Sequence, residues 1–300
     1  MNYELINGVT PQSPVWPRFK QWAKEANAPF IVLQSLPGLL GVEKEEDVHL
    51  RSVIDFLTKR RYTPGNYRFF NEAPVPDGSE IYMSSDGAIN IIYEGETIGL
   101  EVVYANTRRA IKQIDYFNPD GTHDFTEEYA FDGNHYSNLL YYNNALQQIQ
   151  FLNNDGQVVV RQYLFDGKIN LITVEEPSTG RILNRYDNLI SFLTATVSQM
   201  VTAHDTVRIH YMGVEMNALS ESPAHNVLRL VESPFGDDGA VRGFLLMILK
   251  DEIKYIQEVE LSKAAYHALA MQNIPLSKAT IIDDSLSDPD SHFLLIICSS

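Results

Sequence analysis

The sequence predicts an α/β domain that is interrupted by a separate antiparallel β-sheet. Turn signals recur every eleven or twelve residues between Asp120 and Gly167, and short aromatic and β-branched runs separate them. Helical spacing and compact apolar runs occur before this region and again after it. A chain of 300 residues is long enough for two such units. We therefore expect an α/β domain in residues 1–64 and 180–300, with an extended sheet inserted as residues 65–179.

The first sixty residues alternate strand and helix patterns. Residues 2–6 predict a short strand, and residues 17–27 predict a helix with Pro17 in its first turn. The apolar run at 30–33 is typical of a buried strand. Residues 47–60 have the spacing of a second helix. This alternation is the expected opening of an α/β layer.

The inserted segment reads as a meander of hairpins. Asp-Gly pairs favour two-residue hairpin loops, in which both central residues take a positive φ. The turn pairs are Asp120-Gly121, Asp132-Gly133, Asn143-Asn144, Asp155-Gly156 and Asp166-Gly167. The strands expected around them cover residues 89–93, 125–131, 136–142, 146–152 and 158–165. Together they predict one long, twisted sheet with one covered and one solvated face.

Helical texture returns after residue 180. Residues 189–201 carry apolar side chains at three-and-four spacing, which predicts an amphipathic helix. The other expected elements are a strand at 207–211, a short helix at 224–230, a buried parallel strand at 243–249, a helix at 262–272 capped by Ser262, and short apolar strands at 279–282 and 293–297.

Composition narrows the function classes. The net charge of −16, from 39 acidic and 23 basic residues, disfavours nucleic acid and anionic membrane surfaces as partners. Cys298 is the only cysteine, which excludes an intramolecular disulfide and a multi-cysteine zinc site. The N-terminal residues lack the regions of a secretory signal, and no apolar run has the length of a membrane span. We expect a soluble cytoplasmic protein.

The sequence offers no strong catalytic, metal or cofactor motif. Pro37 to Gly41 follows a predicted strand and is a candidate phosphate loop, but a plain turn is the favoured interpretation. Glu252 and Glu260 have the spacing of paired glutamates in many retaining glycosyltransferases, a spacing that is common by chance in an acidic chain. Asp288, Asp290 and His292 could hold a metal, but their Ser/Asp/Pro-rich context favours a solvated loop.

Aromatic side chains gather in the inserted segment and give it the best case for function. The residues predicted to form an acceptor- or partner-binding sheet face are Tyr116, Phe125, Tyr129, Tyr136, Tyr141, Tyr142 and Tyr163. Aromatic pairs also stabilise neighbouring strands, so part of this set is expected to serve the sheet alone. The two roles are compatible.

Several segments carry a family resemblance. Residues 112–121 (KQIDYFNPDG) and 69–76 (FFNEAPVP) resemble parts of the non-catalytic, stabilising subunit of the bacterial two-component O-GlcNAc transferase. That enzyme modifies serine-rich repeat adhesins for the accessory Sec pathway. Residues 188–200, 232–234 and 266–271 are also similar, so the resemblance extends over about residues 15–285.

The resemblance implies a Rossmann-like domain of the GT-B type, with the extended sheet inserted in it. It further implies a chaperone-like protein without transferase activity or cofactor, whose partners are the catalytic subunit and an unfolded Ser/Thr-rich adhesin. Such a protein is cytoplasmic and reaches the membrane only through its complex. Members of this family continue into a second Rossmann-type domain, so a chain that ends at Ser300 is expected to be a truncated or short form.

Three alternatives remain open at this stage. The first is a catalytic glycosyltransferase subunit. The second is another accessory Sec component that acts in export. The third is a free-standing carbohydrate-binding module, which the flanking α/β segments disfavour.

Overall fold

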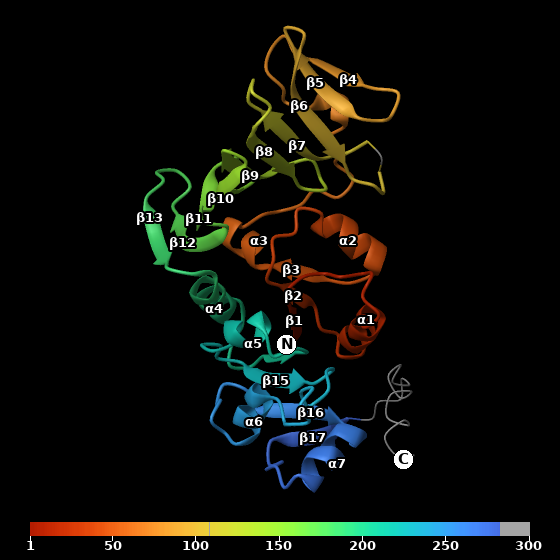
Figure 1. The fold of residues 1–300 in the computed structure, drawn as a ribbon, viewed down its shortest axis with the longest axis vertical. Helices are drawn as coiled ribbons and strands as arrows, with labels where there is room; N and C mark the ends of the chain where they lie inside the picture. Colours follow the sequence, from red (N-terminus) through yellow and green to blue (C-terminus); the bar gives the residue numbers. More distant parts are fainter. Residues whose placement is uncertain (108, 283–300) are drawn as a thin grey trace.

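The protein is built on two sheets, one parallel and one antiparallel (Figure 1). The computed structural model describes residues 1–107 and 109–282. A seven-stranded parallel sheet forms the centre of the α/β unit, and a ten-stranded antiparallel sheet lies beyond one end of it. The predicted fold class is therefore confirmed.

The parallel sheet is doubly wound. Its spatial order is β17-β16-β15-β14-β1-β2-β3, so the chain builds outward from β1 in one direction and then from β14 in the other. The strands are β1 (Asn2–Ile6), β2 (Phe30–Val32), β3 (Leu50–Ser52), β14 (Thr206–Ile209), β15 (His225–Arg229), β16 (Glu258–Ser262) and β17 (Ala279–Ile282). The change of direction lies between β1 and β14, which pair in parallel.

Helices cover the two faces of this sheet unequally. One face packs on α1 (Trp16–Glu25) and α2 (Leu39–Glu46) through Trp16, Phe19 and Leu39. The other face packs on the remaining helices, α3 (Val53–Thr58), α4 (Leu189–Met200), α5 (Val214–Ala218), α6 (Gly243–Leu249) and α7 (Lys263–Met271). Within the described residues, no helix has both the length and the apolar character needed to cross a bilayer.

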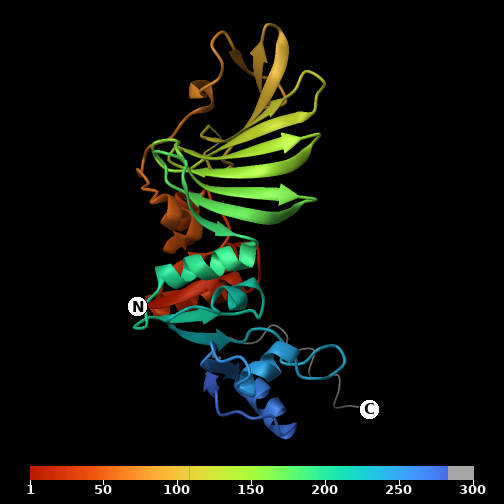
Figure 2. The same cartoon turned by 90° about the vertical axis from the view of Figure 1, so that its left-hand side faces the viewer.

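The antiparallel sheet is formed by the residues between α3 and α4. It is an unbroken meander in which each strand from β4 to β13 pairs with the next one along the chain. After a 3₁₀ turn at Phe70–Glu72, its strands are β4 (Glu80–Met83), β5 (Ile89–Tyr93), β6 (Glu96–Val103), β7 (Ile111–Phe117), β8 (His123–Tyr129), β9 (His135–Tyr142), β10 (Ala145–Leu152), β11 (Val158–Phe165), β12 (Lys168–Glu175) and β13 (Ile182–Tyr186). Figure 2 shows these strands fanning out above α4. The last strand lies beyond the expected boundary at residue 179.

The repeated turn signals all connect strands, but by two different geometries. Asn143-Asn144 and Asp166-Gly167 have positive φ at both residues, as expected for a two-residue loop. In the other three pairs only the glycine has a positive φ, and its N–H bonds back to the residue three positions earlier. These are type I turns that end in a left-handed glycine, so the expectation of two positive φ values was wrong for them. Gly133 has an added reason to lack a side chain, because a Cβ there would lie 2.5 Å from the Arg68 nitrogen.

Two expected elements have the other kind of secondary structure. Residues 224–230 were expected to be helical but form β15, because Val227 and Leu228 are buried in the parallel ladder. Residues 243–249 were expected to be a strand but form α6. In α6 only Leu245, Ile248 and Leu249 are buried, and Phe244 and Met247 face outward, so an all-apolar run conceals a helical period.

The second helix was also misplaced. Residues 47–60 hold β3 and the short helix α3, which Ser52 caps by accepting hydrogen bonds from the Ile54 and Asp55 nitrogens. The preceding helix, α2, begins at Leu39, inside the segment interpreted as a turn. The strand expected at 293–297 lies outside the described residues.

A buried arginine joins the two sheets at the end of α3. The Arg60 guanidinium donates hydrogen bonds to the Leu152 carbonyl and, at 3.1 Å, to the His135 carbonyl. It also lies 4.8 Å from the Tyr136 ring centroid, which places a cation over an aromatic face. Both carbonyls belong to the antiparallel sheet, so one side chain holds two of its strands against the α/β unit.

Neighbouring polar contacts complete this junction. The Tyr62 hydroxyl donates to Asp55 at 2.7 Å, and the Thr63 nitrogen donates to Asp132 at 2.9 Å. The backbone of Arg61 exchanges two hydrogen bonds with the Asn154 side chain, each 2.8 Å long. Burial raises the pKa of Asp55 to about 6, although the Tyr62 hydroxyl and Arg60 oppose that rise.

Replacing Arg60 by methionine is expected to destabilise the protein by about 3 kcal/mol, because two buried carbonyls would lose a charged donor. Chemical denaturation of the purified variant measures this loss. The adjacent Arg61→Met is the matched control, since its side chain is exposed and its contacts to Asn154 use the backbone. Equal stability of the two variants would contradict the role given to Arg60.

Candidate functional site

One face of the antiparallel sheet presents a continuous row of residues across six strands. The strand register places Tyr116, Phe125, Leu140, Gln148, Tyr163 and Leu171 directly opposite one another in sequence from β7 to β12. Directly paired residues share a face, because side chains alternate along each strand. The row therefore marks one surface of the sheet, which we call the row face.

The connection into the sheet covers only one half of the row face. Phe70, Ala73 and Val75 pack over Ile114 and Tyr116 and over Tyr129 nearby, forming a small core with Ile91 and Ile111. On the other half, Leu140, Gln148, Tyr163 and Leu171 are half-buried, and none of the four belongs to an apolar core cluster of the described chain. The helices that contact these strands, α3 and α4, share their core with residues of the opposite face such as Phe151 and Ile172. This uncovered half, on β9 to β12, is the open platform.

Polar side chains next to the platform are held in fixed positions. The Arg161 guanidinium makes hydrogen bonds of 3.1 and 3.2 Å with the two carboxylate oxygens of Glu175, and a third of 3.0 Å with the Gln148 amide oxygen. Burial would raise the pKa of Glu175, but hydrogen bonds from Arg161 and Thr173 prevail and lower it. The platform thus combines apolar rings with ordered hydrogen-bonding groups.

The structure divides the seven aromatic residues predicted as a binding face. Tyr116, Tyr129 and Tyr136 are buried, with 7%, 0% and 0% exposure, so they cannot serve as surface contacts in this state. Tyr129 belongs to the small core, and Tyr136 lies beneath Arg60. For these three, the role in sheet and core packing replaces the role in binding.

The other four are accessible, but on two faces. Phe125 is half-buried and stacks on Tyr116 with ring centroids 4.5 Å apart, and Tyr163 lies on the open platform. Tyr142 ends β9 with 70% exposure. Tyr141 is on the opposite face, where it stacks on His123 at 4.0 Å. Sequence reasoning missed Leu140, Gln148 and Arg161. Two-residue alternation from Tyr163 would have indicated Arg161, whereas Leu140 and Gln148 join this face through the pairing of β8, β9 and β10.

A buried carboxylate lies under the covered half of the row face. Glu101 pairs with Ile89 and Ile114 on the neighbouring strands and is 6% exposed. Neither of its oxygens has a hydrogen-bond partner among the described residues. Burial raises the pKa of Glu101 to about 7.

A second candidate site is a crevice at the carboxyl ends of the parallel strands. Open α/β sheets bind ligands where the strand order reverses, which here is between β1 and β14. A cavity of about 200 Å³ lies there, lined by Asn7, Gly8, His210 and Glu215 among others. A larger one of about 400 Å³ adjoins it at Tyr211.

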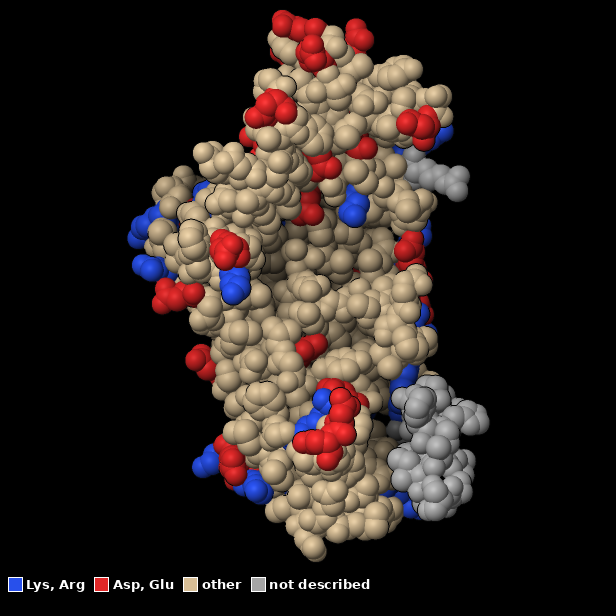
Figure 3. All heavy atoms as spheres, viewed as in Figure 1, with Lys and Arg blue, Asp and Glu red and all other residues tan. Residues whose placement is uncertain are grey.

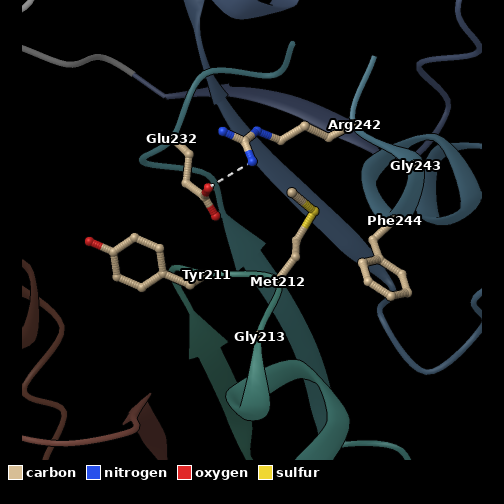
Figure 4. A pocket seen from close by; sticks show the side chains of 7 residues that line it. All are labelled: Tyr211, Met212, Gly213, Glu232, Arg242, Gly243 and Phe244. Atoms are coloured by element: carbon tan, nitrogen blue, oxygen red, sulfur yellow. Dashed lines mark ion pairs between the residues drawn. The ribbon is translucent and has the colours of Figure 1, made fainter. Parts of the chain in front are cut away.

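Figure 4 shows the larger cavity. Glu232 and Arg242 face each other across it in an ion pair of 3.3 Å, and the Tyr211 and Phe244 rings lie on either side of Met212. Deeper in the crevice, His210 Nε2 lies 2.9 Å from Glu4 Oε2, and both side chains are buried. The crevice can therefore hold a small polar ligand against aromatic walls.

The remaining sequence candidates find structural explanations. Gly41 lies against the Phe131 ring, and a Cβ at this position would be only 2.9 Å from ring atoms. The glycine therefore allows α2 to pack closely against a residue in the turn that follows β8 of the antiparallel sheet. Glu260 lies in β16 and is held by Arg208 and Arg229, whereas Glu252 lies in an exposed turn after α6. Asp288, Asp290, His292 and Cys298 lie outside the described residues.

Comparison with solved structures identifies shared architecture. The chain matches the complex of accessory secretory proteins 1, 2 and 3 from Streptococcus pneumoniae at a TM-score of 0.72 and 13% identity, over 94% of this chain and 62% of that one. It matches a GtfA/B complex at 0.71 and 13%, over 97% and 62%. It matches the pneumococcal O-GlcNAc transferase GtfA, solved with UDP and GlcNAc, at 0.73 and 10%, over 94% and 59%.

These matches define the class of fold. The chain shares the GT-B fold of glycosyltransferases, and each match covers at least 94% of the chain, so it takes in most of the extended antiparallel sheet. It spans about three fifths of the length of each of these chains. No protein-family model and no curated protein sequence matches it.

Replacing Glu101 by glutamine is expected to stabilise the protein above neutral pH and to have little effect near pH 5. Because burial raises the pKa of Glu101 in the folded state, ionising this carboxyl costs more in the folded than in the unfolded protein. The free energy of unfolding of the parent protein therefore falls as pH rises from 4.5 through about 7, whereas glutamine, which does not ionise, avoids this loss. The gain at pH 8 should be about 1 to 2 kcal/mol after allowance for partial solvent screening. Urea denaturation at both pH values measures it, with the exposed Glu96→Gln on the same strand as control. A gain independent of pH would contradict this account.

Proposed function

We propose that this protein is a non-catalytic stabilising subunit of a protein O-glycosyltransferase, and that it binds the polypeptide that becomes glycosylated. The observation that carries the proposal is the open platform, an uncovered sheet surface on β9 to β12 attached firmly to the α/β unit. The fold shared with subunits of the GtfA/B complex supports this assignment. On this proposal, a catalytic transferase subunit is the protein partner.

The chemistry of the platform fits an extended, unfolded acceptor rich in serine and threonine. Tyr163, Leu140 and Leu171 offer apolar contact to small side chains, while Gln148 and Arg161 offer hydrogen-bonding groups to hydroxyls and peptide bonds. A net charge of −16 favours a neutral chain over an acidic one. The acceptor would be an adhesin of the serine-rich repeat kind.

Two other functions have an observation in their favour. The crevice at the β1–β14 switch point could hold a sugar nucleotide, which would make the chain a catalytic glycosyltransferase subunit. The chain also shares the fold of a chain in the complex of accessory secretory proteins 1, 2 and 3. This similarity favours the alternative that the protein is an accessory Sec component that acts in export.

Three measurements separate these functions. The stabilising subunit is expected to bind a Ser/Ala/Thr-rich peptide and to co-purify with a catalytic glycosyltransferase, without transferring sugar by itself. A catalytic subunit would instead show a raised melting temperature with UDP-GlcNAc and measurable transfer. An export component would co-purify with the secretion machinery. Sugar transfer by this chain alone would overturn the proposal.

Replacing Tyr163 by alanine is expected to weaken binding of the Ser/Ala/Thr-rich peptide about tenfold, because an aromatic contact at the centre of the platform would be lost. Fluorescence anisotropy with a labelled peptide measures the affinity. Tyr141→Ala is the matched control, since Tyr141 is also half-buried in the sheet but stacks on His123 on the opposite face. If Tyr141→Ala weakens binding as much as Tyr163→Ala, the open platform is not the acceptor site.

A further inference from the structure

The far end of the antiparallel sheet has an unpaired edge. Strand β4 pairs with β5 on one side only and is the outermost strand in the sheet order. An edge strand presents free N–H and C=O groups that another chain can pair with. Tyr82 and Met83 on β4 are 56% and 44% exposed, so side chains as well as backbone are available there.

This edge belongs to a stretch of sequence whose charged side chains are all acidic. The 39 residues between Arg68 and Arg108 contain seven Asp or Glu residues and no Lys or Arg. Six of the acids are exposed: Glu72, Asp77, Glu80, Asp86, Glu94 and Glu96. None of the six forms an ion pair with another described residue. Figure 3 shows acidic side chains at the top of the molecule, where Figure 1 draws β4 to β6.

The charge decides which kind of strand can add to the edge. A second copy of this chain would bring its own acidic surface against this one, and two surfaces of the same charge repel each other. An acidic or phosphorylated segment is disfavoured for the same reason. A basic segment gains from Glu80 on the edge strand and from the negative charge of the surrounding region, and Tyr82 and Tyr93 offer ring faces to its cations.

The alternation along β4 specifies the partner further. Glu80 and Tyr82 project on one face, while Ile81 and Met83 project on the other, in line with Ile91 and Ile89 of β5. A matching strand would carry Lys or Arg on the first face and apolar side chains on the second. We propose that the β4 edge binds a basic, extended segment of another protein as an eleventh strand of the sheet, with cationic and apolar residues alternating.

This surface is separate from the open platform, so it can be tested whether or not acceptor binding holds. The probe is a labelled peptide of alternating lysine and valine, measured by fluorescence anisotropy against the whole chain. The proposal expects saturable binding that weakens steeply with added salt. It also expects about tenfold weaker binding to the triple variant Glu80→Gln, Glu94→Gln, Glu96→Gln, because charge complementarity is reduced.

Two controls make the result decisive. The matched variant Asp155→Asn, Asp166→Asn, Glu221→Gln removes three exposed charges elsewhere on the protein and should bind as the unmodified chain does. The same peptide with alternate backbone nitrogens methylated keeps its charge but cannot extend a sheet, and should bind at least tenfold more weakly. Equal binding of the methylated peptide, or equal loss in the two triple variants, would overturn the proposal. Binding of an alternating glutamate–valine peptide with the same affinity would also overturn it.

Discussion

The structure depends on how the antiparallel sheet is anchored to the α/β unit. A ten-stranded sheet that enters and leaves through α3 and α4 would be free to hinge if only its two connections held it. Arg60 opposes this by placing a buried guanidinium between the carbonyls of two different strands and over the Tyr136 ring. An apolar core shared by the sheet and the α/β unit, with Phe151 and Ile172 on the sheet side, acts in the same direction. The cost of burying that charge is offset by two carbonyl acceptors, the aromatic face and the nearby Asp55 carboxylate.

This anchoring assigns different properties to the two sheets. The parallel sheet is packed on helices. At the carboxyl ends of its strands lie His210, whose Nε2 contacts the buried Glu4 of β1, and the Glu232–Arg242 pair. The antiparallel sheet has a packed half, an uncovered half and a free edge. A rigidly attached, uncovered surface is suited to binding a flexible polypeptide. Only the polypeptide loses conformational entropy on binding, because the surface is already ordered.

The sequence was most informative where the local signal and the tertiary environment agree. The hairpin turns, the capped helix that begins after Ser262 and the amphipathic α4 all follow from short-range chemistry. Burial reversed the interpretation elsewhere. Val227 and Leu228 are strand residues because the neighbouring parallel strand β14 pairs with them. The segment of α6 was predicted as a strand because its two exposed positions, Phe244 and Met247, are apolar and hide the helical alternation of polar and apolar residues.

The candidate site was predicted only in part, for a physical reason. Aromatic residues were counted by segment, but the face that each one occupies depends on strand register and on which half of the sheet residues 69–75 cover. Tyr129 and Tyr136 are therefore core residues, while Gln148 and Arg161, which are not aromatic, line the platform. Register of this kind is set by long-range pairing and cannot be counted from composition.

Hydrogen–deuterium exchange with and without a Ser/Ala/Thr-rich peptide tests the central claim most directly. Binding on the open platform predicts added protection in β9 to β12, with the loops after β1, β14 and β15 unchanged. Protection confined to those three loops would show that the polypeptide occupies the crevice of the α/β unit, and it would contradict the account.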